Sequence, residues 1–121
     1  AFTPVQVAAT AALNGSQKCV EEIRETYKKR RDVLIESFER AGWDKIPEPM
    51  ASMFVWAPLP KKYKKMGSMK FAKNLMINAD VAVAPGLAFG KGGEGFVCIG
   101  LVENTQRIRQ AAKNIKRYFN T

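Results

Sequence analysis

The side chains of this sequence that could carry chemistry are few, and Cys98 is the most informative of them. The chain contains no histidine, so it lacks the commonest general base and metal ligand. Its two cysteines, Cys19 and Cys98, fit no zinc or disulfide spacing. The residue types therefore indicate no metal site in this chain. Cys98 remains a candidate for ligand binding because of the segment in which it lies.

Cys98 falls within residues 96–102, which have the β-branched and aromatic content of a strand. Alternation along a strand divides these side chains between two faces, with Val97, Ile99 and Leu101 on one and Phe96, Cys98 and Gly100 on the other. The first face is suited to packing against helices. Two interpretations of Cys98 remain on the second: a small buried apolar side chain, the common role of free cysteine, or a thiol that faces a ligand.

The composition is that of a globular domain. At 121 residues the chain can bury a core without metal or disulfide links. Hydrophobic residues make up 46% and charged residues 26%, and no apolar run has the length needed to cross a bilayer. The start, Ala1-Phe-Thr-Pro, has neither an initiator Met nor a signal sequence, which predicts a processed or excised chain. The unpaired cysteines favour a reducing, cytoplasmic location.

The net charge raises the question of a nucleic-acid partner. The formal value is +9, but the basic residues form separate groups at 28–31, 61–65 and 113–117. Apart from Tyr63, aromatic residues do not interleave with these groups as they do on a surface that binds single strands. Scattered lysines usually form a solvated surface, so we expect neither a nucleic-acid nor a membrane partner.

Helices and short strands alternate along the sequence. Apolar periodicity and Pro/Gly punctuation predict helices at 5–13, 16–41, 68–78 and from 105 onward, strands at 53–57, 81–84 and 96–102, and loops at 61–67 and 87–95. Thr3, Ser68 and Asn104 are predicted N-caps. The first helix is apolar nearly all round, so another part of the protein should cover it. The order predicts an α/β sandwich in which helices cover one face of a small, mostly antiparallel sheet.

The helices after the first carry apolar stripes. The residues predicted to face inward are Val20, Ile23, Tyr27, Leu34, Phe38 and Ala41 on the second helix; Phe71, Leu75 and Met76 on the third; and Ile108, Ala111, Ala112, Ile115 and Phe119 on the last.

A set of segments, in order along nearly the whole chain, resembles the C-terminal part of the class I and II aminotransferases. They are Pro4 to Leu13, Tyr27-Lys-Lys-Arg-Arg-Asp32, Met53-Phe-Val-Trp56, Gly67-Ser68 with Phe71, Val81 to Gly90, and Val102-Glu-Asn104 with Arg107-Ile-Arg-Gln-Ala111. An ordered set is more specific than any single motif. The chain is similar to the fold type I, aspartate aminotransferase superfamily, and in particular to its aspartate, alanine and LL-diaminopimelate branch.

The resemblance implies a C-terminal fragment of a larger enzyme. Residues 1–15 would end the large domain or connect the two domains, and residues 16–121 would form the small C-terminal domain. The complete enzyme would be a cytoplasmic, homodimeric transferase of amino-acid metabolism, which uses pyridoxal 5'-phosphate (PLP) to move an amino group between an amino acid and a 2-oxo acid. The family's cofactor lysine lies upstream, and Lys70, in Ser-Met-Lys, is better explained as a solvated helix residue. The fragment alone is therefore expected neither to bind PLP nor to transaminate.

The resemblance also gives Cys98 a position. The family's strand usually reads Tyr/Phe-Val-Arg-Ile, and its Arg binds the substrate α-carboxylate. Here Cys98 occupies that position, and a thiol cannot make the bidentate contact of a guanidinium. Lys91 in the adjacent glycine-rich loop is the nearest candidate for a replacement cation, although a lysine there is usually solvated.

Neighbouring segments would surround the same position. The resemblance puts Pro85-Gly86 and Phe89-Gly90 at the mouth of the substrate pocket, while a type II turn explains Pro85-Gly86 without any function. Met53, Phe54 and Trp56 fit either the cleft between domains or the core.

Other functions remain open. The loss of the Arg is compatible with a changed substrate, a degenerate paralogue or an engineered substitution. It also supports a non-catalytic protein-interaction module derived from the same fold, and a basic nucleic-acid binder is a third alternative.

Overall fold

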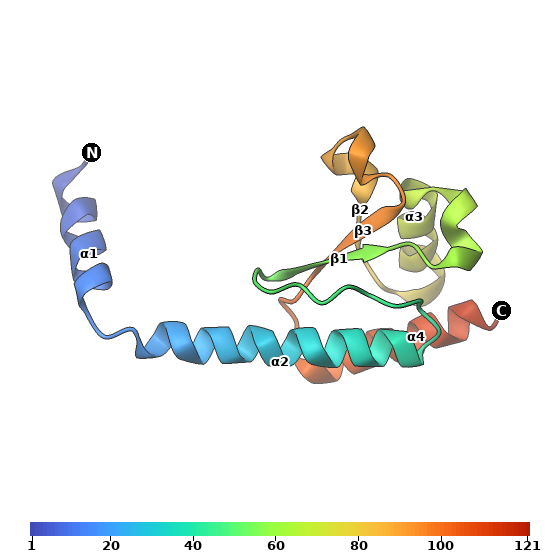
Figure 1. Ribbon diagram of the computed structural model, residues 1–121, viewed down its shortest axis with the longest axis horizontal. Helices are drawn as coiled ribbons and strands as arrows, with labels where there is room; N and C mark the ends of the chain where they lie inside the picture. The colour runs from blue at the N-terminus through green and yellow to red at the C-terminus, as the bar shows by residue number, and fades with distance from the viewer.

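A computed structural model describes all residues, 1–121, and consists of four α-helices, three short strands and three 3-10 helices (Figure 1). Along the chain they are α1 (Thr3–Asn14), α2 (Lys18–Arg40), β1 (Phe54–Pro58), η1 (Lys61–Met66), α3 (Ser68–Ala79), β2 (Ala84–Pro85), η2 (Gly86–Phe89), η3 (Lys91–Gly93), β3 (Phe96–Gly100) and α4 (Thr105–Phe119).

The three strands form one antiparallel sheet in the order β1-β3-β2. Figure 1 shows α2 and α4 side by side along one side of this sheet, with α3 near the end of the sheet where β1 leads into η1. The sheet buries Val55, Ala57, Val97 and Ile99 against these helices. The predicted α/β sandwich, with an antiparallel sheet covered on one face, is confirmed.

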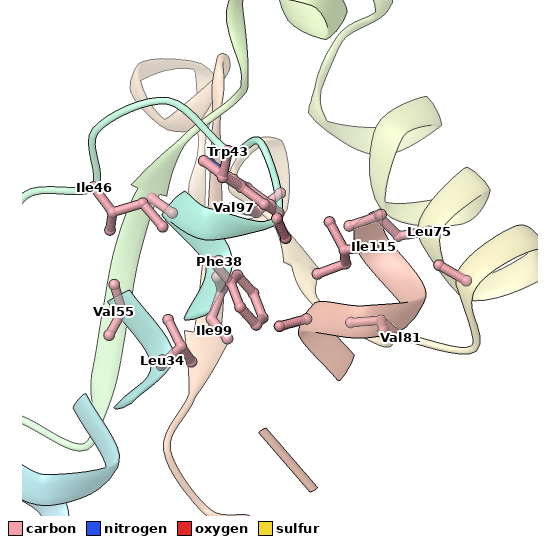
Figure 2. Close-up of a cluster of buried hydrophobic side chains, with 14 of the residues drawn as sticks. Leu34, Phe38, Trp43, Ile46, Val55, Leu75, Val81, Val97, Ile99 and Ile115 are labelled. Carbon is pink, nitrogen blue, oxygen red and sulfur yellow. The ribbon is translucent and has the colours of Figure 1, made fainter. Parts of the chain in front are cut away.

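The core joins the helices and the sheet in one cluster of 19 buried side chains, part of which Figure 2 shows. Trp43 belongs to this cluster and is stacked on Phe38 at 5.6 Å between ring centroids and edge-on to Phe71 at 5.5 Å. Its Nε1 donates a hydrogen bond of 2.9 Å to the carbonyl of Pro58, which ties the turn after α2 to the end of β1. No buried side-chain nitrogen or oxygen lacks a partner, as expected of a well-packed interior.

Helix α1 stands apart from this core. Figure 1 shows it projecting from the N-terminal end of α2, and none of its residues is buried. Val5, Val7 and Leu13 are 62%, 63% and 80% exposed. The N-terminal half of α2 projects similarly, so the predicted inward residues Val20 and Ile23 are exposed as well. The apolar helix α1 is therefore not covered by any part of this chain.

Several local predictions are wrong. Phe2, not Thr3, is the N-cap of α1, and Gly67, not Ser68, is that of α3. The segments predicted as loops contain the 3-10 helices η1, η2 and η3, and β2 is confined to Ala84–Pro85. Met76 is 55% exposed because it lies one step off the stripe that buries Phe71 and Leu75. In contrast, Asn104 caps α4 as predicted, accepting hydrogen bonds of 3.0 Å from the backbone of Gln106 and Arg107.

Candidate functional site

The face of the sheet that the helices do not cover is the candidate site, and we call it the open face. Its residues are Phe54, Trp56, Pro58, Ala84, Phe96, Cys98 and Gly100. They share a face because strand neighbours in register point the same way, and the alternate residues are the buried ones. The predicted division of residues 96–101 between two faces is therefore confirmed. None of these seven residues carries a charge.

Cys98 lies in the middle of the open face. It stands on the central strand, with Trp56 opposite it on β1 and Ala84 opposite it on β2. Its side chain is half-buried, and this desolvation raises the pKa of the thiol. Cys98 therefore stays a neutral thiol at neutral pH, a small and weakly polar group rather than a nucleophile.

Aromatic rings gather beside Cys98. Trp56 stacks on Phe96 with a centroid distance of 5.6 Å and an interplanar angle of 17°. Phe89, from η2, meets Trp56 edge-on at 5.6 Å and 78°. Trp56, Phe54 and Phe89 are 39%, 47% and 64% exposed, which is high for such large apolar side chains. Phe54 and Trp56 are thus on the open face and not in the core, whereas Met53 precedes β1 and accepts a backbone hydrogen bond of 2.8 Å from Leu101.

The glycine-rich segment 86–95 folds back on itself next to the open face. The backbones of Gly86 and Gly93 are in direct contact, so that a Cβ on either would collide with the carbonyl of the other. Gly86 does not have a positive φ, which excludes the type II turn; instead Pro85 leads into η2. Gly90 and Gly95 do adopt positive φ values of 114° and 90°. This backbone places Phe89 against Trp56.

Glu94 and Ser68 fasten this segment to α3. The Glu94 carboxylate accepts hydrogen bonds from the Ser68 amide at 2.6 Å and the Ser68 hydroxyl at 3.1 Å. The fully buried Ser68 Oγ also accepts one from the Leu87 amide at 3.1 Å. Backbone hydrogen bonds from Ser68 and Gly95 hold the pKa of Glu94 below its usual value. Sequence reasoning missed this pair, since the two residues lie far apart in the chain.

No side chain of the open face is a cation, and Lys91 as the replacement for the Arg stays a prediction. Lys91 is exposed in η3 and forms no ion pair. Arg30 donates to the carbonyls of Leu101 and Val102 at 3.0 and 3.2 Å. Arg31 pairs with Asp32 and Glu48 at 2.7 and 2.8 Å. Both arginines are therefore held by contacts within the fold.

The residues of this chain do not by themselves fit PLP. A cofactor lysine has to be held in a pocket with an acidic partner for the pyridine nitrogen. Every lysine of this chain is exposed, including Lys70 on α3, and the open face has neither acid nor base. The structure also contains no cluster of His, Cys, Asp and Glu that could hold a metal ion, and no helix long and apolar enough to span a membrane.

Comparison with known proteins gives the class. The chain belongs to the aminotransferase class I and II family, whose model matches residues 2–115. It is 54% identical, over its whole length, to the putative aminotransferase AatC of Rhizobium meliloti (strain 1021), and it covers 30% of that protein. It is 52% identical, over 98% of its length, to the glutamate-pyruvate aminotransferase AlaC of Escherichia coli (strain K12), of which it covers 28%.

Solved structures share the fold. Substrate-bound BacF from Bacillus subtilis matches 98% of this chain with a TM-score of 0.86 and 32% identity, over 30% of its own chain. The aromatic aminotransferase from Pyrococcus horikoshii OT3 matches 96% with a TM-score of 0.86 and 30% identity, over 31% of its own chain. The fold is that of fold type I aminotransferases, and the chain spans about 30% of the length of these relatives.

Proposed function

We propose that this chain is the part of a PLP-dependent aminotransferase that forms the small domain, and that the whole protein transfers an amino group between an amino acid and a 2-oxo acid. The observation that carries the proposal is the open face, where Cys98 lies among aromatic side chains that nothing in this chain covers. Membership of the family and the similarity to a glutamate-pyruvate aminotransferase support it.

The proposal divides the chain at residue 15. Residues 1–15 contain the uncovered α1 and belong to the large domain or to the connection with it, whereas residues 16–121 hold the core. The remaining part of the protein supplies the cofactor lysine and the other groups that hold PLP, and PLP supplies the electron sink for amino transfer. The complete protein acts as a cytoplasmic homodimer.

The open face contributes an apolar surface from which water is excluded. Trp56, Phe96 and Phe89 present apolar surface to the substrate and exclude water from it, which strengthens the polar contacts that the rest of the site makes. Cys98 stands at the position of the carboxylate-binding Arg. Because it is a neutral thiol, the substrate carboxylate loses its charged partner.

A chimera tests this proposal. The segment of E. coli AlaC that aligns with this chain is replaced by this chain, with Cys98 or with Cys98→Arg. Removing one partner of a buried, hydrogen-bonded ion pair costs about 2–5 kcal/mol, which is roughly 30- to several-thousand-fold in kcat/KM. We expect Cys98→Arg to recover that factor for glutamate and pyruvate. Cys98→Ser, which adds no charge, is the matched control and should recover nothing.

A second candidate is a non-catalytic interaction module, which the uncovered α1 and the neutral Cys98 favour. The two functions differ in the absorbance of bound PLP in the complete protein. Failure of Cys98→Arg to raise kcat/KM in a folded chimera that binds PLP would contradict the carboxylate-anchor role. A complete protein that binds a partner and shows no PLP absorbance would support the module.

A further inference from the structure

The segment 86–95 is connected to Cys98 by an unbroken series of contacts that begins at Glu94. Glu94 accepts two hydrogen bonds from Ser68, and Ser68 accepts one from the amide of Leu87. Leu87 belongs to η2, whose last residue is Phe89. Phe89 packs edge-on against Trp56, the residue opposite Cys98.

We propose that Glu94 is a positioning residue that, through Ser68, fixes η2 so that Phe89 rests on Trp56 and forms an apolar wall beside Cys98. The inference rests on the proposed function and goes beyond it, since it assigns substrate selection to a residue that does not touch the open face. A fixed aromatic wall next to a neutral thiol favours oxo acids and amino acids with large apolar side chains over short ones.

The contacts of Glu94 show why it can perform this role. Its carboxylate binds the first amide of α3, where the helix dipole favours a negative charge. It forms no ion pair, so its hydrogen bonds are not shared with a competing cation. Ser68 is fully buried and uses its hydroxyl both as donor and as acceptor. Loss of the carboxylate leaves the Ser68 amide and hydroxyl without this partner, which loosens the residue that holds Leu87.

Phe89 depends on this attachment and on the Gly86–Gly93 contact because its own side chain makes few contacts. It is 64% exposed, and it is followed by Gly90 with a φ of 114° and nothing within 4 Å of its Cβ position. An exposed ring next to such a glycine has few contacts to hold one orientation. Its aromatic contact is with Trp56. The hydrogen bonds of Ser68 therefore act together with the Gly86–Gly93 contact to set where the ring lies.

The test uses the complete protein with Glu94→Ala, Glu94→Gln and, as a matched control, Glu103→Ala. Glu103 is also exposed and forms no ion pair. Hydrogen exchange is measured for peptides that contain Leu87 and Ser68, and kcat/KM is measured for phenylpyruvate and for pyruvate. In Glu94→Ala we expect exchange at Leu87 to rise on the order of tenfold or more. We expect the phenylpyruvate-to-pyruvate ratio of kcat/KM to fall roughly two- to tenfold, the value of one aromatic contact.

The other variants separate positioning from a general loss of structure. Glu94→Gln keeps one acceptor oxygen and should lie between wild type and Glu94→Ala in both measurements. Phe89→Ala should lower the same ratio without raising exchange at Ser68, and adding Glu94→Ala to it should lower the ratio no further.

Two results would overturn the inference. One is exchange at Leu87 in Glu94→Ala that equals that of Glu103→Ala. The other is increased exchange with an unchanged substrate ratio, which would make Glu94 a purely structural cap. A wild-type protein that transaminates neither substrate would instead refute the proposed function, and with it the role in selection.

Discussion

Substitution of Gly86 by alanine tests whether the backbone of segment 86–95 is as closely packed as the structure indicates. An added Cβ would lie 2.6 Å from the carbonyl oxygen of Phe96 and closer still to that of Gly93. Both obstacles are main-chain atoms, so no side chain can rotate to make room. Gly86 is also buried, which removes the option of turning the new methyl group toward solvent.

The magnitude follows from these contacts. Overpacking a well-packed site costs about 1–3 kcal/mol, and sometimes more. We expect Gly86→Ala to reach the upper part of this range, about 3 kcal/mol, because two separate backbone segments must move. For a domain of this size, 3 kcal/mol corresponds to a decrease in Tm of about 10 °C.

The assay is urea and thermal unfolding followed by far-UV circular dichroism, with Gly92→Ala as the control. Gly92 lies in the same segment, has no positive φ, and has nothing within 4 Å of its Cβ position. It should therefore change the unfolding free energy by less than about 1 kcal/mol. Equal midpoints for the two variants, both close to wild type, would refute the close contact between Gly86 and Gly93 and the placement of Phe89 that depends on it.

Three further predictions concern the core, a cap and pH. Trp43→Phe should lower the free energy of unfolding by about 1–3 kcal/mol, because it removes apolar volume and leaves the Pro58 carbonyl without its donor. Urea unfolding measures this loss, and a loss below about 0.5 kcal/mol would contradict the contact. Asn104→Ala should cost about 1 kcal/mol through loss of the α4 cap, whereas Gln110→Ala on the exposed side of α4 should be nearly neutral. The folded state lowers the pKa of Glu94, so the unfolded chain binds the proton more readily. The stability that Glu94 contributes is therefore fully present at pH values above the ordinary pKa of a glutamate. The difference in Tm between wild type and Glu94→Gln should therefore be largest near neutral pH and disappear as acidification passes the lowered pKa; a difference that grows on acidification would have the wrong sign.

Helix α1 is apolar in sequence and yet exposed in the structure. Val5, Val7 and Leu13 give α1 the composition of a buried helix, yet all three are exposed in this chain. An apolar surface of this kind in a folded protein usually marks an interface. The proposed division at residue 15 accounts for it, because the chain spans only about 30% of the length of its relatives.

The sequence determined those features that depend on local periodicity and on an ordered set of motifs. The alternation at Val97, Cys98 and Ile99 predicted which side chains would be buried, and the stripe through Ile108 and Ile115 predicted the buried face of α4. Both succeed because a strand or helix repeats its environment at a fixed spacing, so that the pattern of apolar residues records the face that leaves water. The family, too, was evident from the order of its segments, and the match over residues 2–115 confirms it.

Only the tertiary structure decided how separate segments meet. Ser68 was predicted to cap α3, but Gly67 is the N-cap, and the side chain that accepts from the first amide of the helix is that of Glu94, 26 residues away in the sequence. The Ser68 hydroxyl instead bonds to Glu94 and to the Leu87 amide of η2. Local residue spacing also does not predict the contact of Gly86 with Gly93 or the packing of Phe89 against Trp56. Such contacts depend on how loops close and on which backbone groups are left without partners. These are properties of the whole packed chain and not of any short window of its sequence.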